Sequence, residues 1–509
     1  MGVDTARVDA LFSDWDRDDA PGCALAIIEA GEIAYARGYG QADLERPTPI
    51  TPASVFDIGS TSKQFTAASV LLLAREGRLS LDDDIHKFLP QLPDLGPISV
   101  RQLVHHTSGI RDYLNLTLIA GRTLDNDQTE DEVLDRIARQ RGLDFQPGSK
   151  HSYSNSGYFL LGEIVRSVSG SSLREFAAER ILKPLGMTRT FFHDDYGELV
   201  AGRALGYSPA GDGSYRLDNP IWDVTGDGAV YTTVEDLRHW DRQFYECSLP
   251  GGADFIREMT TPGRLSGGEE LEYAFGLSIG THRGARTISH GGSWGGYRAE
   301  MLRFPDHRTT IVVLANRADA DASGLAYQVA GIVLGDRLEP APPDESDASE
   351  GRPADLAGLV GVYTDDERTL VVSVEAIGVR VFGQQFELVE VAPGKLRFKG
   401  LPIAVEVAGP GELRLEVGGE ERWTLRRLPA GAPDWSRLSG RYRSSELDVE
   451  YQIALVEDEP RLRRGWQPWE PLAVAGADVL GFSHGVISLR EGGFTVNTGR
   501  ARGIEFERL

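Results

Sequence analysis

The sequence predicts an α+β fold, in which an antiparallel sheet flanked by helices and a helical subdomain is followed by two small antiparallel β-barrels. Strand patterns occur at both ends of residues 1–337 and helical patterns lie between them, as expected for a sheet that is completed late in the chain. Residues 338–354 are rich in Pro, Asp, Glu and Ser and have no apolar periodicity, so they predict a linker. Beyond this linker only short alternating strands remain.

Individual elements of the first domain follow from local periodicity. Residues 23–29 form an apolar run that predicts a buried strand, and residues 33–38 predict its partner after the Ala30-Gly31 turn. Residues 63–76 have apolar side chains at helical spacing and end at Gly77. Further helices are predicted at 1–19, 130–140, 157–169, 173–185, 234–245 and 323–334, and further strands at 273–279, 287–290, 299–304 and 309–314.

The C-terminal region predicts two barrels of about eight strands each, residues 355–430 and 431–509. Leu359-Val-Gly-Val-Tyr363 and Leu438-Ser-Gly-Arg-Tyr442 begin alike and lie 79 residues apart, which suggests two copies of one module. The second barrel is interpreted as lipocalin-like. Because small eight-stranded barrels often have filled interiors, a packing or lid role is favoured over ligand binding.

Composition argues against several function classes. The net charge of −24 argues against nucleic acid and anionic membrane surfaces as partners. No uncharged apolar stretch reaches the roughly 18 residues that span a membrane, and the polar N-terminus lacks the features of a secretory signal, so a cytoplasmic protein is expected. The two cysteines, Cys23 and Cys247, have no metal-site spacing, and we expect neither a metal nor another cofactor.

The strongest local feature is Ser60-Thr-Ser-Lys63 at the start of the helix predicted for residues 63–76. Residues three apart share a helix face, so the Lys63 amine is expected beside the Ser60 hydroxyl. Serine is a weak nucleophile at neutral pH and needs an adjacent base, which a desolvated lysine can provide. Only six lysines occur in the chain, and only Lys63 has a serine three residues before it.

Two further motifs gain weight from their order along the chain. Tyr153-Ser-Asn155 precedes the helix predicted at 157–169, where Tyr153 could relay a proton and Asn155 could bind both Lys63 and a substrate amide. His290-Gly-Gly292-Ser293 follows a predicted strand. There the Ser293 N–H could complete an oxyanion hole with the Ser60 N–H, and His290 could supply either positive charge or a hydrogen bond.

Together, Ser-x-x-Lys near residue 60, Tyr-x-Asn near 150 and His-x-Gly near 290 resemble the serine β-lactamase-like, penicillin-recognising hydrolases. The phrases Leu103-Val-His-His-Thr-Ser-Gly109 and Pro184-Leu-Gly-Met187 resemble the same family, and we interpret them as scaffold. The resemblance covers about residues 5–335. It implies a β-lactamase-like catalytic domain, with Ser60 attacking an amide or ester carbonyl, Lys63 and Tyr153 moving protons, and water cleaving the acyl-enzyme. Which of Lys63 and Tyr153 is the primary base stays open.

The substrate class is open among several alternatives. His290 stands where class C β-lactamases carry a lysine, which lowers the β-lactamase interpretation. The whole layout resembles bacterial D-aminopeptidases, which implies short peptides or small molecules as substrates. The compact second barrel shows no obvious long inserted loop, although residues 465–476 could supply a short one, so a carboxylesterase or a broader D-stereoselective peptidase or amidase is also considered. A non-catalytic ligand-binding or sensing protein is the alternative from another class, and a homodimer is a further possibility.

Overall fold

A computed structural model describes residues 3–340, 352–376, 378–381, 384–392, 394–399, 403–417 and 421–509. The chain forms two compact units. The first comprises residues 1–110, 125–138 and 145–340, and the second comprises 111–124, 139–144 and 341–509. No pattern in the sequence predicts that residues 111–124 and 139–144 belong to the second unit. Most of the predicted linker, 338–354, lies outside the described residues.

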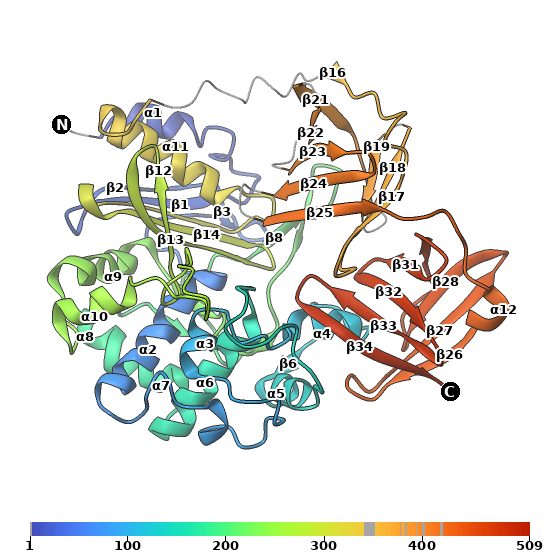
Figure 1. Ribbon diagram of the computed structural model, residues 1–509. Coiled ribbons are helices and arrows are strands. Elements are labelled where there is room, and N and C mark those ends of the chain that lie inside the picture. Colours follow the sequence, from blue (N-terminus) through green and yellow to red (C-terminus); the bar gives the residue numbers. More distant parts are fainter. Residues whose placement is uncertain are drawn as a thin grey trace. The chain divides into compact units, whose positions relative to one another are not determined.

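A six-stranded antiparallel sheet forms the centre of the first unit, as Figure 1 shows. Its strand order is β12-β13-β14-β15-β1-β2, so the N-terminal hairpin pairs with the last strand of the unit, as the sequence predicted. Cys23 of β1 lies opposite Ala315 of β15. The strands are β1 (Cys23–Glu29), β2 (Glu32–Tyr39), β12 (Ser278–His282), β13 (Ala285–Trp294), β14 (Tyr297–Phe304) and β15 (Thr309–Ala315).

Helices cover both faces of this sheet (Figure 1). The helix α11 packs with α1 against an apolar face that includes Leu25, Ile27 and Ile311, while α9 contacts the other side of β1, β2 and β15. The helices of the first unit are α1 (Thr5–Ala10), α2 (Lys63–Arg75), α3 (Val100–Val104), α5 (Glu130–Ala138), α6 (Asn155–Ser169), α7 (Leu173–Ala177), α8 (Lys183–Leu185), α9 (Val234–Glu246), α10 (Gly252–Met259) and α11 (Ala322–Leu334). In the described part of the chain, no helix combines the length and apolarity needed to cross a bilayer.

Short strand pairs complete the first unit around the sheet and helices. They are β3 (Gln41–Asp43) with β4 (Thr48–Pro49), β5 (Phe56–Asp57) and β7 (Phe191–Phe192) on either side of β11 (Val230–Thr232), β6 (Gln128–Thr129) with β10 (Trp222–Asp223), and β8 (Tyr207–Pro209) with β9 (Tyr215–Leu217). The predicted helix at 1–19 is helical only over Thr5–Ala10, and the predicted strand at 273–279 begins at Ser278.

The second unit contains two barrel-shaped antiparallel sheets, with ten and nine strands where the sequence predicted about eight each. The first sheet encloses an apolar interior with a remaining space of about 10 Å³, enough for roughly one water molecule. Its strands are β16 (Arg352–Pro353), β17 (Gly361–Asp365), β18 (Val371–Glu375), β19 (Gly378–Val381), β20 (Gln384–Phe386), β21 (Leu388–Ala392), β22 (Lys395–Phe398), β23 (Ile403–Gly409), β24 (Glu412–Val417) and β25 (Glu421–Arg427).

A helix from much earlier in the chain contributes to the core of the second barrel. Leu116 and Ile119 of α4 (Tyr113–Ile119) belong to its apolar core, and Tyr451 Oη donates to the main-chain oxygen of Ile119 at 2.6 Å. Its other elements are α12 (Trp435–Leu438), β26 (Gly440–Ser444), β27 (Val449–Val456), β28 (Glu459–Arg464), β29 (Glu470–Pro471), β30 (Ala473–Val474), β31 (Val479–Phe482), β32 (Gly485–Arg490), β33 (Gly493–Thr498) and β34 (Ala501–Arg508).

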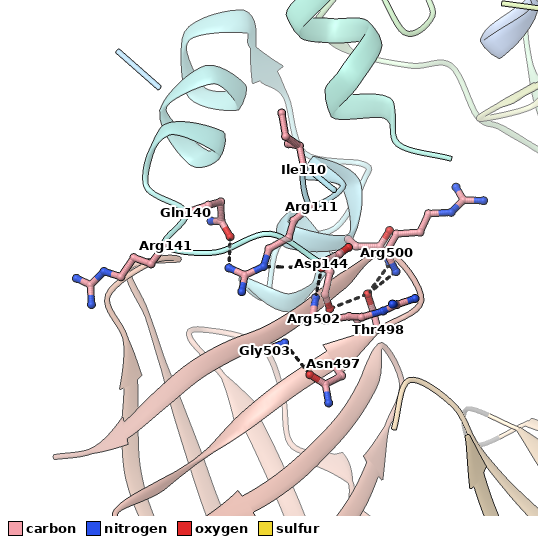
Figure 2. A network of polar contacts seen from close by, with 12 residues as sticks. Ile110, Arg111, Gln140, Arg141, Asp144, Asn497, Thr498, Arg500, Arg502 and Gly503 are labelled. Carbon is pink, nitrogen blue, oxygen red and sulfur yellow. Dashed lines mark hydrogen bonds and ion pairs between the residues drawn. The ribbon is translucent and has the colours of Figure 1, made fainter. Parts of the chain in front are cut away.

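A buried ion cluster fixes residues 111 and 139–144 to this barrel. Arg111 Nη1 lies 2.6 Å from Glu446 Oε2, and Arg111 Nε lies 3.8 Å from Asp144 Oδ1. Figure 2 shows Arg111 directed at Gln140 and Asp144, while the Arg502 main-chain N–H donates to Asp144 Oδ1 at 2.7 Å. Each of the three charged side chains Arg111, Asp144 and Glu446 is at most 5% exposed, so the positive and negative charges must compensate each other.

Candidate active site

Ser60 lies in a tight 3₁₀ turn, Gly59–Ser62, that leads directly into α2. Gly59 has a φ of +48°, and a Cβ there would lie 2.7 Å from the Ser293 nitrogen, so this position requires glycine. The Gly59 N–H donates to Asp57 Oδ1 at 2.8 Å, and burial raises the pKa of Asp57 to about 7. Ser60 itself is partly exposed at the positive end of α2.

Lys63 is fully buried and its amine contacts three oxygens. Nζ lies 3.0 Å from Ser60 Oγ, and it donates to Asn155 Oδ1 at 2.9 Å and to the main-chain oxygen of Asp227 at 2.5 Å. The amide and main-chain oxygens can only accept hydrogen bonds. The contacts with Asn155 and Asp227 therefore hold the amine beside the Ser60 hydroxyl.

The third sequence motif, His290–Ser293, lies on the part of β13 that extends beyond the end of the neighbouring strand β12. β12 pairs only with Ala285–Ser289 of β13, so His290–Trp294 extends beyond it. This extension contacts the turn that holds Ser60: Thr61 Oγ1 donates to the His290 oxygen at 3.0 Å, and a Cβ on Gly292 would lie 1.9 Å from the Ile58 oxygen. Gly292 is thus required for the close packing of the Gly59–Ser62 turn against β13.

His290 is held as a neutral ring by its surroundings. Burial, followed by the nearby charge of Lys63, lowers the pKa of His290 to about 4. Burial raises the pKa of Tyr273 well above its usual value, so Tyr273 keeps its proton and donates to His290 Nε2 at 3.0 Å. His290 Nδ1 then carries the ring proton and donates to the Gly291 oxygen at 2.6 Å. Of the two roles considered from sequence, positive charge is disfavoured at neutral pH, and both ring nitrogens already have partners within the protein.

Tyr153 and Asn155 contact Lys63 from the segment that leads into α6. The Tyr153 ring centroid lies 4.9 Å from Lys63 Nζ and 6.3 Å from the His290 ring centroid. Asn155 is the first residue of α6, two residues earlier than predicted, and its side-chain oxygen contacts Lys63. At this position, at the start of the helix, the side-chain amide of Asn155 points towards the Lys63 amine.

The structure therefore brings Ser60, Lys63, Asn155, Tyr153 and the His290–Ser293 strand into one site. Sequence reasoning missed two contributors, Tyr273 and the Asp227 carbonyl. A main-chain acceptor has no side-chain signature, and Tyr273 is one of 16 tyrosines with no distinguishing motif around it. The arrangement suits nucleophilic attack by a serine beside an amine base. Among the described residues, no group of His, Cys, Asp and Glu is placed to hold a metal ion.

Comparison with known proteins identifies a family. The family model described as Beta-lactamase matches residues 8–334. A D-aminopeptidase from Gluconobacter oxydans is 30% identical over 462 residues, covering 89% of this chain and 85% of the relative.

Two solved structures share the fold. The octameric penicillin-binding protein homologue from Pyrococcus abyssi has a TM-score of 0.59 at 22% identity and covers 99% of both chains. The D-amino acid amidase from Ochrobactrum anthropi SV3 has a TM-score of 0.53 at 22% identity, covering 65% of this chain and 99% of the amidase. The first match extends over the C-terminal barrels as well as the catalytic region.

Proposed function

Because this chain belongs to the β-lactamase family of serine hydrolases, we propose that it is a D-aminopeptidase, or a closely related D-stereoselective peptidase or amidase, acting on short substrates. The observation that carries this proposal is the contact of Lys63 Nζ with Ser60 Oγ, in a site whose other groups hold the amine in place. The D-aminopeptidase relative supports the substrate class, since its alignment spans both the catalytic region and most of the C-terminal region.

In the proposed acylation, the Ser60 hydroxyl proton moves to the Lys63 amine as Ser60 Oγ bonds to the substrate carbonyl carbon. The carbonyl oxygen takes the negative charge and accepts hydrogen bonds from the Ser60 and Ser293 N–H groups. Lys63 is assigned as the base because its Nζ lies 3.0 Å from Ser60 Oγ, close enough to take the hydroxyl proton.

Tyr153 is assigned to the leaving group. As the carbon–nitrogen bond breaks, the departing amine needs a proton, and Tyr153 donates it and is reprotonated through Lys63. Asn155 orients the amine and the substrate amide. The ring of His290 contacts Tyr273 and the Gly291 oxygen, and so holds the part of β13 that contacts the Ser60 turn. Water then attacks the acyl carbon, Ser60 regains its proton, and the acid product leaves.

Three finer features of the protein stay predictions. The cytoplasmic location follows only from the sequence, and the homodimer is checked by size-exclusion chromatography with light scattering. The lipocalin-like interpretation of the second barrel is likewise a prediction, and its interior includes the apolar core around α4.

The proposal is tested with a chromogenic panel and the Ser60→Ala variant. The panel contains D- and L-alanine p-nitroanilide, p-nitrophenyl acetate and nitrocefin. We expect turnover of the D-anilide well above the L-anilide, lost by at least about 1,000-fold in Ser60→Ala. Ester turnover alone would replace the proposal with a carboxylesterase, nitrocefin turnover alone with a β-lactamase, and turnover that survives the substitution would contradict the Ser60 mechanism.

A further inference from the structure

The side chain of Tyr153 is positioned by a loop rather than by regular structure. Ser60 and Lys63 are held by the turn and helix α2, but Tyr153 precedes the first residue of α6 and lies outside every helix and strand. A group that transfers a proton must be held within a fraction of an ångström of its target. Something outside the loop must therefore fix the backbone on both sides of Tyr153.

His106 contacts the backbone on both sides of Tyr153. The Ser152 N–H donates to the main-chain oxygen of His106 at 2.9 Å, and the Ser154 N–H donates to His106 Nδ1 at 3.1 Å. One residue thus binds the two neighbours of Tyr153, one through its backbone and one through its side chain. Because Nδ1 accepts a hydrogen bond, it carries no proton in this arrangement.

The His106 ring also packs against the Tyr153 ring. The two ring centroids are 4.2 Å apart, and the centroids of Tyr158 and Tyr273 lie 5.0 and 4.7 Å from that of His106. His106 is only 1% exposed. Tyr153 is therefore fixed through its ring as well as through its flanking amides.

The backbone of His106 is itself in an uncommon conformation. Its φ is +55°, in the left-handed region that costs a non-glycine residue free energy and that histidine, asparagine and aspartate tolerate best. The conformation belongs to the C-terminal cap of α3: the His106 N–H donates to the Leu103 oxygen at 3.3 Å and the Thr107 N–H donates to the Gln102 oxygen at 2.9 Å. The cap of α3 therefore fixes the position from which His106 contacts the loop that carries Tyr153.

We propose that His106 is a positioning residue for Tyr153, and that its Nδ1 acceptor sets the orientation in which Tyr153 protonates the leaving group. This inference rests on the proposed function, because Tyr153 has that role only in amide cleavage. It changes the interpretation of the His-His-Thr-Ser-Gly phrase: His106 acts on the chemistry through Tyr153, without touching substrate.

The test compares His106→Gly with His106→Asn. Both residues tolerate positive φ, but only asparagine retains a side-chain acceptor near the position of Nδ1. We expect His106→Gly to lower kcat for the D-anilide by about 100-fold with KM within about threefold, and His106→Asn to restore kcat to within about tenfold of wild type. Melting temperatures report folding, and His106→Ala carries the same comparison if the glycine variant does not fold.

A second readout separates positioning from general damage. Fluorophosphonate labelling of Ser60 releases fluoride, which needs no proton from Tyr153, so we expect labelling of His106→Gly within about fivefold of wild type. Equal loss of labelling and anilide turnover, or wild-type kcat in His106→Gly, overturns the inference. So does an asparagine variant as impaired as the glycine variant.

A third readout does not depend on turnover. In hydrogen exchange of the peptide covering residues 150–156, His106→Gly should lose protection of the Ser154 amide, while the Ser152 amide stays bonded to a main-chain oxygen. If the wild type cleaves no amide, the proposed function fails. The positioning contact is then judged by exchange alone, and unchanged exchange in His106→Gly overturns it.

Discussion

Two buried cations, Lys63 in the first unit and Arg111 in the second, are held in opposite ways. Lys63 is 0% exposed, and the oxygens within hydrogen-bond distance of its amine belong to a hydroxyl, an amide and a main-chain carbonyl, none of which is charged. Arg111 is 5% exposed and contacts two carboxylates, those of Glu446 and Asp144.

The difference in their partners fits the different roles that we propose for Lys63 and Arg111. A guanidinium stays protonated in proteins, and two carboxylates around it make a static cluster that fixes one chain segment to another. An amine among neutral oxygens keeps a lone pair available whenever it loses its proton, and one of its contacts is the nucleophile itself. The carboxylates around Arg111 thus fit a structural role, and the neutral oxygens around Lys63 fit the role that we propose for it.

The largest expected effect is the loss of activity in Lys63→Met. Removing the base should lower kcat for the active substrate by about 1,000-fold or more. The melting temperature should stay within a few degrees, since methionine fills most of the same volume. Activity within tenfold of wild type would show that Lys63 is not the base.

Arg111→Met should lower the stability of the second unit. It leaves Glu446 buried without its cation and removes one of the two cations that act on Asp144. We expect the free energy of unfolding of the second unit, measured by urea titration, to fall by about 3–5 kcal/mol. The triple variant with Glu446→Gln and Asp144→Asn should recover part of this loss, because no buried charge is left unpaired. An Arg111→Met variant as stable as wild type would contradict the structural role.

Packing of β13 against the nucleophile turn gives a smaller effect. A methyl group in Gly292→Ala would lie 1.9 Å from the Ile58 oxygen, so β13 must shift away from Ser60. We expect kcat to fall by about 100-fold. The control is Gly280→Ala in the neighbouring strand, where the nearest atom is a threonine hydroxyl at 3.2 Å; it should retain activity within about threefold. Equal activity of the two variants would show that this close packing is unnecessary.

The smallest effect is a pH dependence of stability that arises at His290. Its pKa is about 4 in the folded protein and near the ordinary 6.5 when unfolded, so the neutral ring favours folding above pH 6.5. This contribution is lost as the pH falls from 6.5 towards 4, at up to about 1.4 kcal/mol per pH unit. His290→Gln removes it. Urea unfolding between pH 7.5 and 4.5 should therefore show a shallower loss of stability on the acid side in the variant, and identical slopes would contradict a neutral, buried His290.

The sequence predicted those parts of the site that depend on local geometry. Ser60 and Lys63 are three residues apart at a helix start, so their contact follows from helix geometry alone. The contact of β1 with β15 followed from placing strand patterns at both ends of the domain.

Contacts between distant segments were beyond that reasoning. Nothing local indicates that Arg111 meets Glu446, 335 residues away, or that the Asp227 carbonyl binds Lys63. The role of His106 depends on a backbone conformation and a partner loop that only the folded chain reveals, which is why its motif was interpreted as scaffold.

The most direct test of the central claim is to trap the acyl-enzyme. Wild-type protein is mixed with a D-alanine ester, quenched in acid within seconds and digested, and the peptide that contains Ser60 is examined by mass spectrometry. We predict the added mass of one acyl group on Ser60, and its absence from the Ser60→Ala variant. Steady turnover with an unmodified Ser60 peptide, or an adduct on another residue, would contradict the account.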